Sequence, residues 1–214
     1  MTLRPETHLG PEPHAEARRR AVSGFTLYDV ANSAFITTVV TAVGGPFLTA
    51  IAEEAARDDG RVVLLGLQPR AASVFAYAVS FSVVLQVLML PLLGALSDRP
   101  AAKRQVLVVS TVIGSLATIA LALVPLGSPL LGVLAFVVAN VAYGAAILVY
   151  NAYLADVAEL PDRDRVSARG YAYGYLGGAF VLALSLGLIT AAAGGFSIGI
   201  ANFIGFIPIR SDGQ

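Results

Sequence analysis

The chain has 214 residues, of which 57% are hydrophobic and 13% are charged, and its mean hydropathy is +0.76. Soluble domains carry about 25% charged residues, so this composition excludes an ordinary soluble protein and predicts an integral membrane protein. The formal net charge is zero, which gives no argument for a nucleic-acid partner.

Residues 1–23 are polar, rich in Pro, Glu and Arg, and end in Arg18-Arg19-Arg20. This composition cannot bury enough apolar surface to fold, so we predict a disordered cytoplasmic tail. A cleaved signal is the alternative. The apolar run that follows is longer than a signal core and carries Asp29, which favours the tail.

The first span is predicted at about residues 24–50, long enough to cross the hydrocarbon of a bilayer. Gly44-Gly45-Pro46 should loosen or kink its far end, because proline removes a backbone donor and glycine resists helix. Residues 53–70 carry both acids and arginines and are predicted to form the outside loop.

Two long segments without Asp, Glu, Lys or Arg follow, Ala71–Ser97 and Gln105–Ala155. The first is one span and the second is two spans joined at Gly127-Ser128-Pro129. The predicted transmembrane bundle fills residues 24–209, with a C-terminal tail at 210–214 and later spans at about 71–96, 105–126, 130–154 and 171–193, plus a partial sixth at 196–209.

A short charged turn between the second and third spans sets the orientation. It carries Arg99, Lys103 and Arg104, and the positive-inside tendency places such a loop in the cytoplasm. Alternation then puts the N-terminus and the loop 156–169 inside as well. On this topology Arg57, Arg61 and Arg70 lie outside and the other eleven of the 14 basic residues lie inside. The expected location is a bacterial inner (plasma) membrane.

The first span carries an ionisable residue, Asp29, within the apolar sequence. Asn32 and Ser33 follow at i+3 and i+4, so the three side chains share one face of a helix. An intramembrane acid is by default a candidate for substrate or ion handling. The alternative is structural, because Asp29 lies close to the inner end of the helix, where its charge favours the positive terminus.

The fourth span carries a polar stripe at helical spacing that includes Asn140, Tyr143 and Asn151. These residues are candidates for the lining of a substrate or ion pathway. Hydrogen bonding between helices is the competing role. Ser82 and Gln86 share a face of the second span, which is a weaker signal of the same kind.

The fifth span begins with Gly170, Gly174 and Gly178 at four-residue intervals. Small residues at this spacing let another helix approach closely, so we predict a packing surface. A sliding surface in a moving transporter remains the alternative.

The sequence offers no site for an enzymatic reaction and no cofactor motif. The chain has no Cys, so it has no thiol nucleophile and no thiolate metal ligand. His8 and His14 lie in the tail, which leaves no histidine for a metal site within the membrane. We therefore expect neither an enzyme nor a metal protein.

The segment Gly94-Ala95-Leu96-Ser97-Asp98-Arg99, followed by Lys103-Arg104, resembles the signature loop between spans two and three of the major facilitator superfamily. Ala101 and Ala102 stand where that pattern has Gly and a basic residue. The resemblance implies a cytoplasmic gating motif, formed by Gly94, Asp98, Arg99, Lys103, Arg104 and Asp156. In this motif we expect Asp98 to accept from helix-terminal amides and Arg99 to pair with Asp156. The alternative is that these charges only set the topology.

Four further segments resemble the vacuole-effluxer-like branch, relatives of fungal vacuolar amino-acid exporters. They are Tyr28–Phe35, Asn151–Asp156, Arg165–Gly170 and Gly174–Gly178. The resemblance implies the N-terminal six-helix half of a twelve-helix transporter, built from two inverted three-helix repeats. It also implies a secondary transporter of a small solute, with amino-acid efflux as one activity of the branch.

A non-transporting assembly or regulatory protein that keeps the fold is the alternative function. Because the substrate site of such a fold lies between two halves, we expect these residues to need a C-terminal half or another chain. Ile dominates after Gly195, whereas no Leu follows Leu188 and no Val follows Val181. That change predicts a truncated or frameshifted product, and a short span of unusual composition is the alternative.

Overall fold

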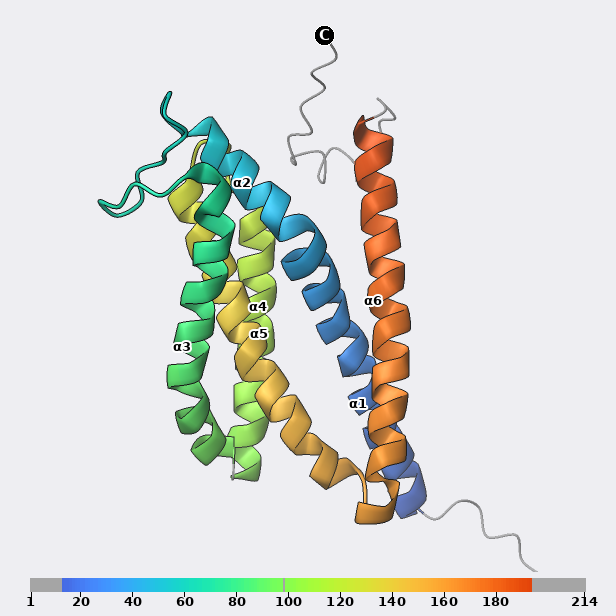
Figure 1. Ribbon diagram of the computed structural model, residues 1–214. Helices are drawn as coiled ribbons and strands as arrows, with labels where there is room; N and C mark the ends of the chain where they lie inside the picture. Colours follow the sequence, from blue (N-terminus) through green and yellow to red (C-terminus); the bar gives the residue numbers. More distant parts are fainter. Residues whose placement is uncertain (1–12, 98, 194–214) are drawn as a thin grey trace, which may run out of the picture.

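The computed structural model describes residues 13–97 and 99–193, in which the regular elements are helices (Figure 1). Five of the helical segments are long and apolar enough to cross a membrane. The elements in chain order are α1 (Pro13–Ala34), the π-helix η1 (Phe35–Val43), α2 (Gly44–Glu54), the 3₁₀ turn η2 (Ala71–Ser73), α3 (Val74–Ser97), α4 (Pro100–Ala122), α5 (Pro129–Val157), the 3₁₀ turn η3 (Leu160–Asp162) and α6 (Arg163–Ala193).

The first spanning segment is longer than the sequence predicted. Residues 13–23, expected to be disordered, form the first turns of α1. Arg18 in these turns forms an ion pair with Asp162, the last residue of η3, with Nη2 2.8 Å from Oδ2. The composition of residues 13–23 alone cannot predict an ion pair with a residue far away in the sequence.

The helix does not break at Gly44-Gly45-Pro46. α1, η1 and α2 form one continuous rod, and the irregularity is a π-helix just before the glycines (Figure 1). The amide of Gly44 donates to the carbonyl of Val39, five residues back, and the hydroxyl of Thr41 donates to the carbonyl of Ile36 over 2.8 Å. Wider turns thus accommodate the region around Pro46 without ending the helix.

α6 also begins earlier than predicted. The basic residues 163–169, placed by the sequence in a cytoplasmic loop, form its first two turns. The connection from α5 is short, and Arg163 closes it by donating from Nε to the carbonyl of Ala158 over 3.2 Å. This bond satisfies a carbonyl near the C-terminal end of α5.

Helix pairing follows a reciprocal pattern. α1, the first helix of the first three-helix unit, packs along α6, the second helix of the next unit. α5, the first helix of the second unit, packs along α3, the second helix of the first. This exchange is the arrangement expected of two inverted repeats. It leaves α5 in contact with α4 along its length, with α3 toward one end and with α1 and α6 toward the other (Figure 1).

The core consists of separate apolar clusters at the two ends of the bundle. At the end of the bundle near the loop between α2 and α3, Phe47, Leu48 and Ile51 of α2 pack on Phe136 of α5. At the opposite end, Phe25, Tyr150 and Val166 join α1, α5 and α6. Between them lies the polar region that contains the candidate site.

The loop between α2 and α3 folds back on itself. Leu64 and Leu67 exchange backbone hydrogen bonds across a turn in which Leu65 and Gly66 have φ of 50° and 85°. Val62 is buried there with Ala52 of α2, which ties the loop to the outer end of the bundle.

Some sequence expectations lie outside the described residues. They are the tail before Pro13, Asp98 of the charged turn, the partial sixth span at 196–209 and the C-terminal tail at 210–214.

Candidate functional site

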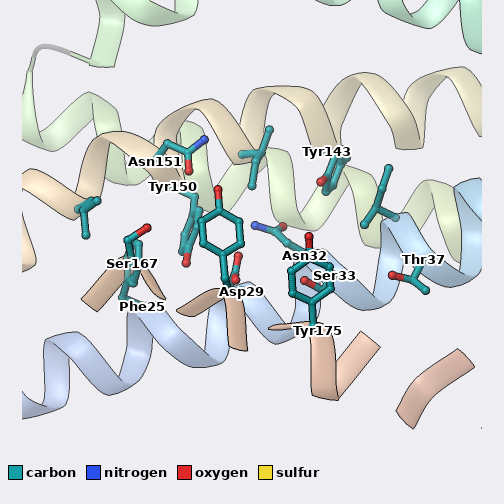
Figure 2. A pocket seen from close by; sticks show the side chains of 14 residues that line it. Phe25, Asp29, Asn32, Ser33, Thr37, Tyr143, Tyr150, Asn151, Ser167 and Tyr175 are labelled. Atoms are coloured by element: carbon teal, nitrogen blue, oxygen red, sulfur yellow. The ribbon is translucent and has the colours of Figure 1, made fainter. Parts of the chain in front are cut away.

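A polar cavity of about 270 Å³ lies between α1, α5 and α6 (Figure 2). α1 and η1 contribute Asp29, Asn32, Ser33 and Thr37 to its lining, and α5 contributes Tyr143 and Asn151. The structure therefore brings together five of the six residues that the sequence proposed for a pathway. The complete lining is Phe25, Asp29, Asn32, Ser33, Ile36, Thr37, Tyr143, Ile147, Tyr150, Asn151, Leu154, Ser167, Tyr171 and Tyr175.

Asp29 lies at the contact between α1 and α6. Only 6% of the residue is exposed. Its carboxylate is within hydrogen-bonding reach of the Tyr150 hydroxyl. A Cβ at Gly174 would lie 2.6 Å from Oδ2 of Asp29 and 2.7 Å from Oγ of Ser33. The absence of a side chain at Gly174 thus makes room for both polar groups between the helices.

Each of the three predicted packing glycines faces α1. Gly170 lies beside Phe25, Gly174 beside Asp29, and a Cβ at Gly178 would meet the backbone carbonyl of Ser33 at 3.1 Å. Gly177, which the four-residue spacing did not select, is also close, because a Cβ there would overlap the side chain of Val30. α6 therefore approaches α1 along a continuous glycine surface.

Tyr150 is fixed by aromatic stacking at the inner end of the cavity. Its ring centroid lies 4.3 Å from that of Phe25 and 5.4 Å from that of Tyr28, with interplanar angles of 14° and 23°. Phe35 stacks on Tyr143 in the same way, with centroids 5.2 Å apart. These contacts fix the orientation of the phenols of α5 at the cavity wall.

Asn32 is buried with 8% exposure, and its Nδ2 has no hydrogen-bond partner. In Figure 2 its amide points into the space between α1 and α5. Asn32 also borders a second, more apolar groove of about 390 Å³ between α1, α4 and α5, where the Oγ1 of Thr38 has no partner either. Unpaired buried polar atoms of this kind call for a ligand or water.

Asn140 is the predicted pathway residue that lies outside the cavity. Its Nδ2 donates to Oγ of Ser82 over 2.7 Å, and its backbone carbonyl accepts from Nε2 of Gln86 at 3.2 Å. These are contacts between α5 and α3, the structural role that competed in the sequence analysis. The stripe on α5 faces two different neighbours, because the helix crosses from α3 at one end to α1 and α6 at the other.

At the cytoplasmic end by the predicted topology, Asp156 of α5 pairs with Lys103 of α4, with Nζ 2.7 Å from Oδ2. The expected partner, Arg99, is instead exposed at the N-cap of α4 with extended backbone. Lys103 lies one turn into the helix, where the side chain faces α5. Gly94 lies near the end of α3 with open space around its Cα, and Arg104 is exposed.

Phe25, Ser167, Tyr171 and Tyr175 also line the cavity, although the sequence analysis did not propose them as site residues. A signal for three of them was present. Ser167, Tyr171 and Tyr175 recur at four-residue intervals on α6 and so share one face, next to the glycines. The sequence analysis considered the four-residue spacing of the glycines in this segment and not that of these polar residues.

These features define a class of protein, an integral membrane protein in which long apolar helices surround a polar cavity. Residues 17–204 match the model of the family described as vacuole effluxer Atg22 like. The chain belongs to this family, within the major facilitator transporters. The resemblance found in the sequence is thereby confirmed.

A relative from Bacillus subtilis (strain 168), described as the uncharacterized MFS-type transporter YxiO, is 28% identical over 171 residues. The match covers 79% of this chain and 38% of the relative. The chain thus spans well under half the length of that protein. No solved structure matches the chain significantly.

Proposed function

We propose that this chain forms one half of a secondary transporter that moves a small solute through the cavity beside Asp29. The observation that carries the proposal is the cavity itself, which holds a buried acid and an unpaired amide within an otherwise apolar bundle. Polar groups inside a membrane are costly and persist where they handle a substrate or ion. Membership of a family of transporters also supports a transport function.

The proposed location is a bacterial inner membrane, with the N-terminus and the α3–α4 and α5–α6 connections in the cytoplasm. The first turns of α1, α4 and α6 lie at one end of the bundle, and the loop between α2 and α3 lies at the other (Figure 1). Arg18, Lys103 and Arg163 belong to the former turns, and Arg57, Arg61 and Arg70 belong to that loop. Short basic connections favour the cytoplasmic side. The similarity to a protein from a bacterium supports a bacterial membrane as the location.

The ion pair between Lys103 and Asp156 is proposed to hold the cytoplasmic ends of α4 and α5 together during transport. Lys103 is largely buried, with 13% of its side chain exposed, and its Nζ also lies 5.2 Å from the centroid of the Tyr153 ring. The charged turn would thus act as part of a gate. Amino acids are the first solutes to test, as members of the branch that the sequence resembles export them.

The proposal requires a second half, because the substrate site of such transporters lies between two bundles. We expect no solute flux from the purified chain in liposomes. Flux should appear when the chain is co-expressed with the segment of YxiO that follows the matched region, and Asp29→Asn should abolish it. Flux by the chain alone would refute the half-transporter proposal. Absence of flux in both preparations, with the two segments assembled, would favour the non-transporting alternative.

A further inference from the structure

Asp29 is the one charged side chain in the lining of the cavity, as far as the described residues go. The lining contains no Lys, Arg or His, and Asp29 forms no ion pair within the part of the chain that the structure describes. A carboxylate with 6% exposure in a membrane needs either a proton or a positive partner. When it is deprotonated, Asp29 is therefore a negative group with no positive side chain beside it in the described lining.

The nearest basic side chains are engaged elsewhere. The guanidinium of Arg169 lies 5.6 Å above the ring of Tyr173, away from the cavity. Arg163 donates to carbonyls at the end of α5, and Arg18 pairs with Asp162. None of these groups lines the cavity, so no basic side chain of the described residues supplies a positive charge beside Asp29.

The walls of the cavity are rich in aromatic rings. Phe25, Tyr143, Tyr150, Tyr171 and Tyr175 all contribute to the lining. The faces of such rings attract ammonium groups, and the attraction is stronger where water is excluded. Tyr171 and Tyr175 are largely exposed at the rim and stack on each other, with centroids 6.5 Å apart.

A second polar contact is available one helical turn from the acid. The amide of Asn32 is more than nine-tenths buried, has an unpaired Nδ2 and points into the cavity (Figure 2). It can bond a polar group of a ligand whose charge is held by Asp29. The two residues are separated by three positions on one helix face, so one small molecule can reach both.

We propose that the cavity binds a small organic amine with a net positive charge, its ammonium group against Asp29 and its apolar part among the aromatic rings. This inference rests on the proposed function, and for the same site it favours a cationic amine over the zwitterionic amino acids. A zwitterion is disfavoured, because its carboxylate would find no positive side chain in the described lining. A neutral molecule is disfavoured because it would leave a deprotonated Asp29 unbalanced.

The test compares three ligands that share a phenol ring and differ in charge. Tyramine is a monocation, tyrosine is a zwitterion and tyrosol is neutral. We would measure the thermal unfolding of the purified 214-residue chain in detergent with each ligand. A ligand that binds the folded state raises the melting temperature in a saturable way. Tyramine should do so, whereas tyrosine and tyrosol at equal concentration should not.

Variants then locate the binding. Asp29→Asn should abolish the stabilisation by tyramine. Asp164→Asn is the control and should preserve it, because this substitution removes the same charge from an exposed residue in the first turn of α6, outside the cavity. Tyr171→Leu at the exposed rim should weaken tyramine binding by about two- to five-fold. This substitution leaves the core intact, so the test does not depend on whether Asp29→Asn folds.

Three outcomes would overturn the inference: equal stabilisation by tyrosine and tyramine, no stabilisation by tyramine, or an effect that survives Asp29→Asn. The transport proposal is separable from these results. If co-expressed halves moved a neutral or zwitterionic solute in an Asp29-dependent manner, the half-transporter would stand and the amine specificity would fall. Asp29 would then act on the solute or a proton without a cationic substrate.

Discussion

Lys103 Nζ lies 2.7 Å from Oδ2 of Asp156 and joins the first turn of α4 to the last turn of α5. Half of the Asp156 side chain is exposed, so water screens the pair. A double-mutant cycle with Lys103→Gln and Asp156→Asn should give a coupling of about 0.5–1 kcal/mol in chemical unfolding. The more exposed pair Arg20–Glu16 is the control, and its coupling should be smaller. Equal couplings would refute a special role for Lys103.

Gly174→Ala should destabilise the protein by about 1–3 kcal/mol, because the added methyl would lie 2.6 Å from Oδ2 of Asp29. Gly187→Ala is the matched control on the same helix, since nothing lies within 4 Å of a Cβ there. It should leave stability unchanged or raise it slightly through helix propensity. Thermal unfolding in detergent measures both, and similar losses at the two positions would contradict the close contact of α1 and α6.

Asn140 and Asn151 should respond differently to replacement by alanine. Asn140→Ala removes the buried bond to Ser82 and should cost about 0.6–1.7 kcal/mol of unfolding free energy. Asn151 is exposed to the cavity, so Asn151→Ala should change ligand binding and leave stability within about 0.5 kcal/mol. A stability loss at Asn151 matching that at Asn140 would place both residues in packing.

The orientation can be tested cleanly, because the chain contains no cysteine. Asp59→Cys in the outer loop should react with an impermeant maleimide in intact cells. Ala101→Cys, exposed at the start of α4, should react only after the membrane is opened. Labelling of Ala101→Cys in intact cells would reverse the topology.

The spans were predictable because hydropathy is a local property. Long uncharged apolar segments such as Ala71–Ser97 predict transmembrane helices directly. The charged helical ends were missed for the same reason: residues 13–23 and 163–169 look like loops when only composition is considered. Both segments pack on parts of the chain far apart in sequence, as Val22 and Val166 do in one apolar cluster, and composition does not report such contacts.

The sequence predicted which residues of the candidate site share a helix face, but not how the helices cross. The i, i+3, i+4 spacing correctly placed Asp29, Asn32 and Ser33 on one face of the first span. On α5 the same reasoning joined Asn140 to Asn151, although the neighbours of the helix change between them. Asp156 pairs with Lys103, one turn into α4, and not with the expected Arg99. Charge alone did not distinguish these two basic residues.

The π-helix at Phe35–Val43 gives the first spanning rod a tolerance to length change. Each of its wider rings encloses one residue more than an α-helical ring, so the segment holds a spare residue. Deletion of Val40 can then be absorbed by a return to ordinary α-helical bonding, with Asp29 and Phe47 keeping their faces. Deletion of Val138 in the regular α5 would instead turn everything beyond it by about 100°. The first deletion should yield folded protein on size-exclusion chromatography, and the second should not.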